Sequence, residues 1–217
     1  MKKIAMVYTG AGVVSALSGM AKEMYPDSEI MNLLDDTLIG DCVKAGEMTK
    51  DVRRRLMNIF QYAYEAGANC ILLTCSSVGE AAYTGSQMLP VPILRIDDPM
   101  AREAVERAHR IGVIATLSTT LNPTCDLVQR WAQKLNREVD IVRGLAEGAY
   151  EAVISGDGER HDAIIAQTAA QLSGRCDIFL LAQASMARME QKLSQITGKP
   201  VYSSPRSGIR QLGAYLS

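Results

Sequence analysis

The segment Cys75-Ser76-Ser77 places a thiol where chemistry is favoured. Cys75 closes a short apolar run that begins at Cys70, and small hydroxyl residues follow it before a helix-like stretch. The N–H groups of a helix N-terminus lower the pKa of a neighbouring thiol and attract a carboxylate. This pattern predicts a base or nucleophile at Cys75, with Ser76 and Ser77 beside it in an anion site.

Cysteines in apolar strands are usually inert packing residues, and the chain has five cysteines in all. Only Cys75 combines the carboxyl end of a predicted strand with a polar continuation. Because open α/β sheets bind ligands at the carboxyl ends of their strands, we favour chemistry over packing there. The odd cysteine count without a pairing pattern, and only two histidines, both in helix-like stretches, predict neither disulfides nor a metal site.

Composition indicates an ordinary globular chain of one or two small domains: 217 residues, 47% hydrophobic, 22% charged and a net charge of −1. No apolar segment is long enough to span a membrane, and the first residues lack the apolar region of a signal peptide, so we expect a cytoplasmic location. Scattered Lys and Arg residues give no footprint for nucleic acid or membrane. The expected ligand is a small molecule.

Short apolar runs alternate with longer amphipathic runs, which predicts an α/β fold with largely parallel sheets flanked by helices. The strands are expected at residues 4–8, 29–34, 70–74, 91–96, 111–116, 139–142, 177–182 and 201–203. The helices with the strongest patterns are expected at residues 50–66, 99–110, 121–136, 146–154 and 160–174.

An internal repeat divides the chain into two halves. Residues 66–78 resemble residues 172–186, and residues 4–10 match residues 111–117. We therefore expect two pseudo-symmetric lobes of about four strands each, with the active site between them, since clefts between lobes are preferred ligand sites. The predicted lobes are residues 1–97 with a C-terminal helix at about 205–217, and residues 98–204. The loops expected at the site are Thr9–Gly12, Cys75–Ser77, Thr116–Thr120 and Gln183–Ser185.

Three motifs carry a resemblance to a known family: TCSSVGE at 74–80, ATLSTTLNPT at 115–124 and LAQASMA at 181–187. They resemble the aspartate/glutamate/hydantoin racemase superfamily, and the likeness extends over essentially the whole chain. The resemblance implies two pseudo-symmetric α/β lobes and no cofactor. The racemases of this superfamily use two cysteines that flank the α-carbon of the substrate. One cysteine removes the proton, and the other returns a proton to the opposite face.

Under this resemblance Cys75 matches the first catalytic cysteine, and Gln183 falls where the second should be. An amide does not exchange a proton as a thiol does at neutral pH, although it can donate two hydrogen bonds. The resemblance therefore makes a symmetrical two-thiol racemisation doubtful for this chain. We assign Cys75 and Gln183 to the catalytic positions. The expected substrate-binding residues are Thr9, Gly10, Ser76, Ser77, Thr116, Thr119, Thr120, Ala184 and Ser185.

Two further departures concern the supporting acid–base groups of glutamate racemases. Tyr8-Thr9 stands in place of an aspartate–serine pair, and Ser185 in place of a histidine. Without these groups, a relative that acts on a more acidic substrate is favoured over an amino-acid racemase that needs strong help with an α-proton. Within the superfamily we expect an isomerase of racemase or epimerase type that acts next to the carboxylate or acyl group of a small organic acid or amino-acid-like compound. The alternatives are a malonate-type decarboxylase, a maleate-type cis-trans isomerase and a non-catalytic carboxylate-binding protein.

Other interpretations stay open. Gly10-Ala11-Gly12, followed by Asp35 and Asp36 about twenty residues later, imitates the fingerprint of a dinucleotide-binding oxidoreductase, but Ser15 replaces its third glycine. Helix capping is the simpler role for the threonines before residue 121 and for Asp97 and Asp98 before Pro99. The oligomeric state is also open, with a homodimer a common arrangement for small enzymes.

Overall fold

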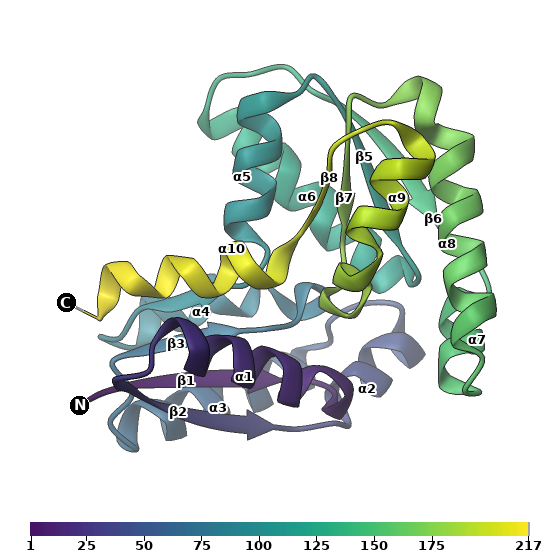
Figure 1. Ribbon diagram of the computed structural model, residues 1–217. Coiled ribbons are helices and arrows are strands. Elements are labelled where there is room, and N and C mark those ends of the chain that lie inside the picture. The colour runs from purple at the N-terminus through teal and green to yellow at the C-terminus, as the bar shows by residue number, and fades with distance from the viewer. Residues whose placement is uncertain (217) are drawn as a thin grey trace. The chain divides into compact units, whose positions relative to one another are not determined.

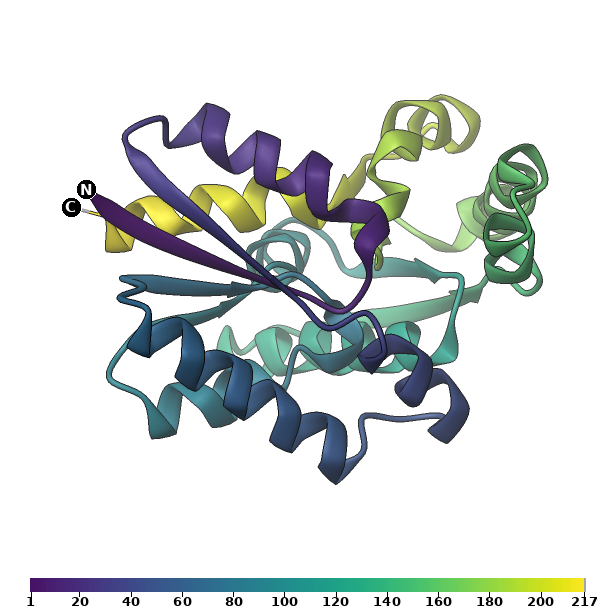
Figure 2. The same cartoon turned by 90° about the horizontal axis from the view of Figure 1, so that it is seen from below.

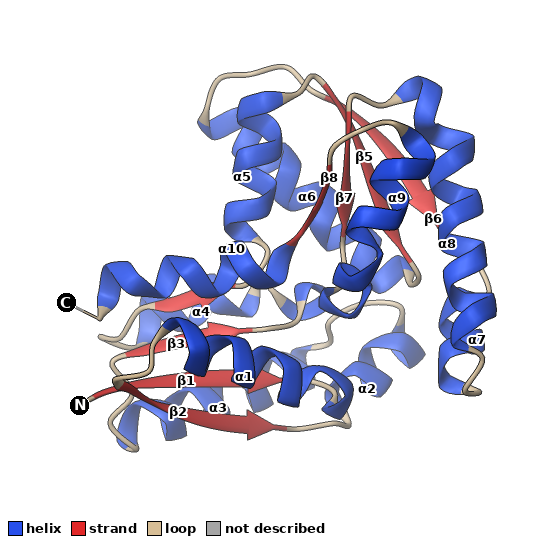
Figure 3. Ribbon diagram, viewed as in Figure 1, coloured by secondary structure: helices blue, strands red, loops and turns tan. Residues whose placement is uncertain are grey.

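The computed structural model describes residues 1–216, and its chain divides into two compact units. Lobe one is Met1–Asp98 together with the segment from Pro205 onward, and lobe two is Pro99–Ser204. Each lobe contains one four-stranded parallel sheet flanked by helices (Figures 1 and 3). The predicted fold class, with four parallel strands in each sheet, is confirmed.

In lobe one the sheet has the order β2-β1-β3-β4. Its strands are β1 (Lys2–Tyr8), β2 (Ser28–Leu34), β3 (Cys70–Leu73) and β4 (Ile93–Arg95). Its helices are α1 (Val14–Met24), α2 (Leu38–Ala45), α3 (Lys50–Glu65), α4 (Ala81–Met88) and α10 (Ser204–Arg210). Apolar residues of α2, α3 and α4 form a core with β1, β3 and β4, and α1 and α10 lie on the side of the sheet opposite α3 (Figure 2).

Lobe two repeats this topology with the order β6-β5-β7-β8. Its strands are β5 (Arg110–Ala115), β6 (Asp140–Leu145), β7 (Ile178–Leu181) and β8 (Val201–Ser203). Its helices are α5 (Asp98–Arg107), α6 (Ser118–Lys134), α7 (Ala149–Ile154), α8 (Gly158–Leu172) and α9 (Glu190–Thr197). Two apolar cores cover the sheet, one with α5 and α6 and the other with α8 and α9.

The strand register sets which residues leave each sheet together. In lobe one Tyr8 pairs with Leu34, and Val7 pairs with Leu73, so the residues after β1, β2 and β3 emerge at one edge. In lobe two Ala115 pairs with Leu145, and the β7 end joins the same edge. The central strands of both sheets are buried along most of their length, as parallel strands covered on two faces should be.

Several predicted boundaries differ from the structure by a few residues, as at the strand expected at 139–142, which is β6 at Asp140–Leu145. Three other differences concern the predicted site loop, α7 and the C-terminal segment. The expected loop Thr116–Thr120 is partly helical, because α6 already begins at Ser118. The helix expected at 146–154 begins at Ala149, after Gly148, which has a φ of 83° that favours glycine. The C-terminal helix expected at about 205–217 ends at Arg210 and continues as a 3₁₀ turn over Gln211–Tyr215, while residue 217 lies outside the described residues.

Within residues 1–216, no helix has the length and apolar character needed to cross a membrane.

Candidate functional site

Cys75 lies just beyond the carboxyl end of β3. Its backbone is extended, with φ −120° and ψ 117°, and a 3₁₀ turn over Ser76–Val78 follows directly. Thr74 ties this strand end to β1, because its N–H and its hydroxyl both donate to the carbonyl of Val7, at 3.0 and 2.8 Å. Cys75 is half-buried, whereas the other cysteines are buried. It is therefore the thiol that a ligand can reach.

The Cys75 thiol makes no hydrogen bond within the described part of the chain, so its sulfur is uncommitted. Ser76 and Ser77 are buried beside it. Cys42 of α2 belongs to the core on which Cys75 packs. Burial, with smaller contributions from the charges of Cys75 and Asp41, raises the pKa of Cys42 to about 11. Cys42 is consequently a neutral thiol at pH 7.

Thr9 and Gly10 follow β1 at the same edge of the lobe-one sheet as Cys75. Thr9 is buried, and Gly10 is extended, with open space where a side chain would be. The N–H of Asp35, which follows β2, donates to the carbonyl of Tyr8 at 3.2 Å. The ends of β1 and β2 are thus joined beside the predicted site.

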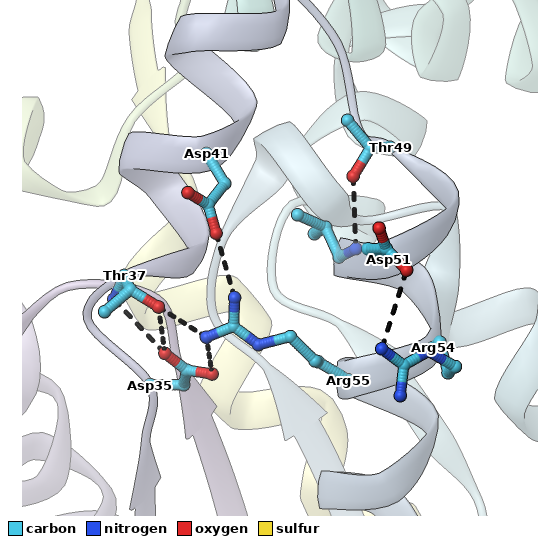
Figure 4. Close-up of polar contacts among 8 residues, drawn as sticks. Asp35, Thr37, Asp41, Thr49, Asp51, Arg54 and Arg55 are labelled. Carbon is cyan, nitrogen blue, oxygen red and sulfur yellow. Dashed lines mark hydrogen bonds and ion pairs between the residues drawn. The ribbon is translucent and has the colours of Figure 1, made fainter.

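Arg55 of α3 holds the loop after β2 in place (Figure 4). Its guanidinium donates to Asp35, to the hydroxyl of Thr37 and, at 2.9 Å, to Asp41. Burial opposes ionisation of Asp35, but the hydrogen bonds from Thr37 and Arg55 outweigh it and lower the pKa of this carboxyl. Asp35 is one of the two acidic residues that the dinucleotide alternative assigns to a ribose, and here it is bonded to Thr37 and Arg55.

In lobe two, Gln183 stands just beyond β7, extended, before the 3₁₀ turn Ala184–Met189. Both ends of its amide bind Thr116, which follows β5. The carbonyl oxygen accepts from the Thr116 N–H at 2.8 Å, and the amide nitrogen donates to the Thr116 hydroxyl at 2.6 Å. Because the hydroxyl accepts that bond, its own proton remains a donor for another group. Gln183 therefore orients Thr116.

The N-terminus of α6, at Ser118, lies two residues after Thr116. The preceding residue, Leu117, has no side chain that could cap the helix, and the helical hydrogen bonds begin with the N–H of Thr120 donating to the Leu117 carbonyl at 3.1 Å. The N–H groups of the first helical residues, Ser118 and Thr119, precede that ladder. An uncapped helix N-terminus attracts an anion.

Thr119 strengthens this indication. Its side-chain oxygen is buried and has no hydrogen-bond partner among the described residues, and the residue is only 6% exposed. A buried hydroxyl without a partner costs about 1–3 kcal/mol. Thr120 is also buried, in the same first turn. The capping role considered for Thr119 is not realised, and a bound oxyanion would supply the missing partner.

The rest of the lobe-two turn is more open. Ala184 is half-buried and Ser185 is exposed. The turn is tied to α8 by Arg188, which donates to Asp162 at 2.6 Å, while His161 contacts the same carboxylate at 2.8 Å. The contact between Arg188 and Asp162 could not be predicted from the sequence, because the two residues are 26 positions apart in the chain.

Lobe one also contains a pair that the sequence did not predict. Arg95, the last residue of β4, makes two hydrogen bonds of 2.9 Å to Asp97. Capping is the role expected for Asp97, but both of its carboxylate oxygens accept hydrogen bonds from Arg95. Asp98 accepts a hydrogen bond from the hydroxyl of Tyr83 at 3.3 Å. Across residues 1–216, no group of three or more His, Cys, Asp or Glu side chains could hold a metal.

Comparisons with known proteins agree with this architecture. The model of the Asp/Glu/hydantoin racemase family matches residues 7–212. The chain belongs to this family. The resemblance inferred from the three sequence motifs is thereby confirmed. No curated protein matches the sequence.

Solved structures share the fold at low sequence identity. Glutamate racemase RacE1 from Bacillus anthracis has a TM-score of 0.80 and 16% identity, over 99% of this chain and 81% of that one. Allantoin racemase from Klebsiella pneumoniae has a TM-score of 0.74 and 13% identity, over 99% and 87%. A putative Asp/Glu racemase from Yersinia pestis has a TM-score of 0.71 and 14% identity, over 99% of both chains.

Proposed function

We propose that this protein is a cofactor-independent isomerase that acts next to the carboxylate or acyl group of a small organic acid or amino-acid-like compound. Cys75 is its base or nucleophile. The observation that carries the proposal is that Cys75 alone among the five cysteines is partly exposed, with an uncommitted sulfur at a strand's carboxyl end. Membership of the racemase family supports this assignment.

The proposal assigns the anionic part of the substrate to the threonines of lobe two. The N-terminus of α6 has no side-chain cap, and the hydroxyl of Thr119, which has no hydrogen-bond partner among the described residues, is the second observation that favours an oxyanion there. Thr116 adds a donor that Gln183 has already oriented. Preorganised donors of this kind stabilise a carboxylate and the negative charge that develops on it when an α-proton leaves. Ser76 and Ser77 would act beside the thiol, and Thr120 beside Thr119.

Because Gln183 stands where a second cysteine would be, the proposal places a proton-transferring thiol on only one face of the substrate. Its amide carries no transferable proton at neutral pH, and both ends of the amide are already bonded to Thr116. Cys75 would remove a proton from one face of the substrate and return it to that same face. Exchange of the α-proton with solvent should then be faster than inversion at the α-carbon.

The two hydrogen bonds between Gln183 and Thr116 also favour a second candidate function, a maleate-type cis-trans isomerisation. In that reaction the Cys75 thiolate adds to a carbon–carbon double bond, the resulting single bond rotates, and elimination of the thiolate restores the double bond in the other geometry. One thiol is sufficient, because the sulfur that adds is the sulfur that leaves. The carboxylates of the substrate would use the donors of Thr116 and α6.

Proton NMR in deuterium oxide tests the proposal. A panel of chiral acids, amino acids, hydantoins, substituted malonates and cis-alkene diacids is incubated with the wild type, with Cys75→Ala and with Cys70→Ala. Cys70 is a matched control because it is a buried cysteine of β3, the strand that leads to Cys75. Loss of an α-proton signal, or a change of alkene geometry, in the wild type and Cys70→Ala but not in Cys75→Ala supports the assignment.

Other outcomes of this experiment point elsewhere. Release of carbon dioxide would identify a decarboxylase. Binding of a panel member without turnover would favour the carboxylate-binding alternative. Turnover that survives in Cys75→Ala would overturn the role proposed for the thiol.

A further inference from the structure

The buried pair Arg95–Asp97 lies at the end of β4, next to β3 in the lobe-one sheet. The two side chains are only 2% and 1% exposed. Removing two charges from water is costly, and a buried ion pair often stabilises a fold no better than apolar residues of the same volume. A contribution to stability therefore does not explain why this pair is buried. The residues that contact the pair indicate another role.

The guanidinium of Arg95 lies flat against Gly79. A Cβ atom at Gly79 would be 2.5 Å from both Cζ and Nε of Arg95. The backbone of Gly79 has φ −54° and ψ −32°, which every residue adopts, so conformation does not require glycine there. The position needs glycine because the guanidinium occupies the space of a side chain.

Gly79 closes the turn that begins at Cys75. Its N–H donates to the carbonyl of Ser76 at 3.1 Å, and the N–H of Val78 donates to the carbonyl of Cys75 at 3.4 Å. The turn contains no long polar side chain that could brace it from within. A planar group packed against Gly79 therefore limits how far the backbone after Cys75 can move.

Arg95 is itself fixed from several directions. The Tyr83 ring centroid lies 5.6 Å from its Cζ, and the Gln211 side chain donates to its carbonyl at 2.8 Å. The next residue, Ile96, donates through its N–H to the Leu73 carbonyl of β3 at 3.0 Å. Burial disfavours the charged guanidinium, but Asp97 outweighs that effect and raises the pKa of Arg95 above its usual range. The arginine is thus permanently charged and held in one place.

We propose that the Arg95–Asp97 pair is a positioning device for the Cys75 thiol. The ion pair fixes the guanidinium, the guanidinium supports Gly79, and Gly79 fixes the turn that presents the sulfur. Arg95 and Asp97 are positioning residues, because no contact joins them to the thiol itself. The inference rests on the function proposed for Cys75.

The test uses alkylation of the native protein by iodoacetamide, which needs no substrate. Because the other cysteines are buried, the reaction reports on Cys75. The rate is measured against pH for the wild type, Gly79→Ala, the double variant Arg95→Met/Asp97→Asn and the triple variant. The double variant removes both charges together and so avoids leaving one charge buried alone.

We expect Gly79→Ala to change the alkylation rate of Cys75 about tenfold and to shift its pH profile, a rate change that corresponds to roughly 1.4 kcal/mol. The double variant should show a similar change. Adding Gly79→Ala to the double variant should add little, because the unbranched Met side chain can give way to the new methyl group. This non-additivity is the signature of a direct contact.

The control is Arg54→Met/Asp51→Asn, which makes the same substitutions in the exposed ion pair of α3 shown in Figure 4. It should leave the rate and the pH profile of Cys75 unchanged. If the folded double variant retains the wild-type profile, or if Gly79→Ala acts equally in both backgrounds, the positioning role is wrong. A lower melting temperature with an unchanged alkylation rate and pH profile of Cys75 would indicate that the Arg95–Asp97 pair is purely structural.

The two proposals fail separately. A wild type that turns over no substrate, but whose Cys75 profile depends on Arg95 and Gly79 as described, contradicts the proposed function and leaves the positioning role intact. A wild type that exchanges α-protons, together with a double variant that exchanges them equally fast with an unchanged Cys75 profile, contradicts the positioning role alone.

Discussion

The two lobes of this protein have the same sheet order but end their equivalent strands differently. In each lobe an extended residue beyond the third strand precedes a 3₁₀ turn: Cys75 in lobe one and Gln183 in lobe two. The thiol is uncommitted, whereas the amide binds Thr116 through both of its ends. Equivalent strand ends of one topology thus carry a thiol without a hydrogen bond in lobe one and a doubly bonded amide in lobe two.

The arginine–aspartate pairs beside these two turns differ in how exposed they are. Behind the Cys75 turn, Arg95 and Asp97 are almost fully buried. The lobe-two turn is held by Arg188 and Asp162, whose side chains are 54% and 17% exposed. The function proposed for Cys75 would account for this difference, because small displacements of a reacting group slow the chemistry strongly.

The largest expected effect separates the two strand ends by activity. Cys75→Ser should lower the rate of α-proton exchange or isomerisation by about 10²–10⁴-fold, the range for loss of a catalytic proton-transfer group, with little change in melting temperature. Gln183→Leu should cost only about 10- to 30-fold, because it removes two hydrogen bonds of about 1 kcal/mol each. The NMR exchange rate and thermal melting monitored by circular dichroism provide both readings. Equal losses in the two variants would remove the distinction between the lobes.

The second effect separates the two arginine pairs by stability. Arg95→Met leaves Asp97 buried without its partner and should lower the free energy of unfolding by about 3–5 kcal/mol. Arg188→Met breaks a pair open to solvent and should cost about 1 kcal/mol or less. Urea unfolding measures both. A cost for Arg188→Met that matches the cost for Arg95→Met would show that exposure does not distinguish the two pairs.

The third prediction concerns the helix N-terminus of lobe two. Thr119→Val removes the unpaired hydroxyl, so it should raise the free energy of unfolding by about 1 kcal/mol while raising the KM about tenfold. Thr124→Val is the matched control. The Thr124 hydroxyl donates to the Thr120 carbonyl at 2.9 Å, and its loss should lower stability and leave the KM unchanged. A loss of stability in Thr119→Val would mean that its hydroxyl does have a protein partner.

The smallest effect is a pH dependence in each lobe. Burial works against ionisation of Asp162, but Arg188 and His161 outweigh it and lower the pKa of its carboxyl. The unfolded chain therefore binds this proton more tightly, so the ion pair stabilises the fold above about pH 4 and less as the pH falls. Asp162→Asn should lower the free energy of unfolding by about 1 kcal/mol or less at pH 7, since solvent screens the pair.

The difference between Asp162→Asn and the wild type should close in acid. Asp35→Asn in lobe one should behave in the same way, because the pKa of Asp35 is also lowered. Urea unfolding at several pH values measures the gap. A gap that widens as the pH falls would contradict the sign for either residue.

Much of the fold could be predicted from the sequence, because it rests on local patterns. Buried parallel strands form apolar runs, so the expected strand at 201–203 coincides with β8, and β1, β2, β3, β5 and β7 differ by at most two residues at each end. The internal repeat led to two sheets of equal topology. The start of α6 at Ser118 cannot be predicted in this way, because Ser and Thr favour caps and loops as well as first helical turns.

Contacts between distant residues could not be predicted. The Gln183–Thr116 bonds join residues 67 positions apart, and nothing in either local sequence indicates them. Gly79 looked like part of a motif, but its neighbour Arg95 is known only from the fold. The roles of Cys75 and of the other site residues stay predictions, since their residue types are suggestive and their chemistry has to be measured.

One measurement tests the central claim, that thiol chemistry belongs to lobe one alone. Each enantiomer of a substrate from the panel is incubated separately in deuterium oxide, and deuterium incorporation and optical inversion are followed together for the wild type and Gln183→Cys. We predict that the wild type exchanges the α-proton of one enantiomer faster than it inverts the centre, and that Gln183→Cys raises the ratio of inversion to exchange. A wild type that inverts both enantiomers as fast as it exchanges them would contradict the claim.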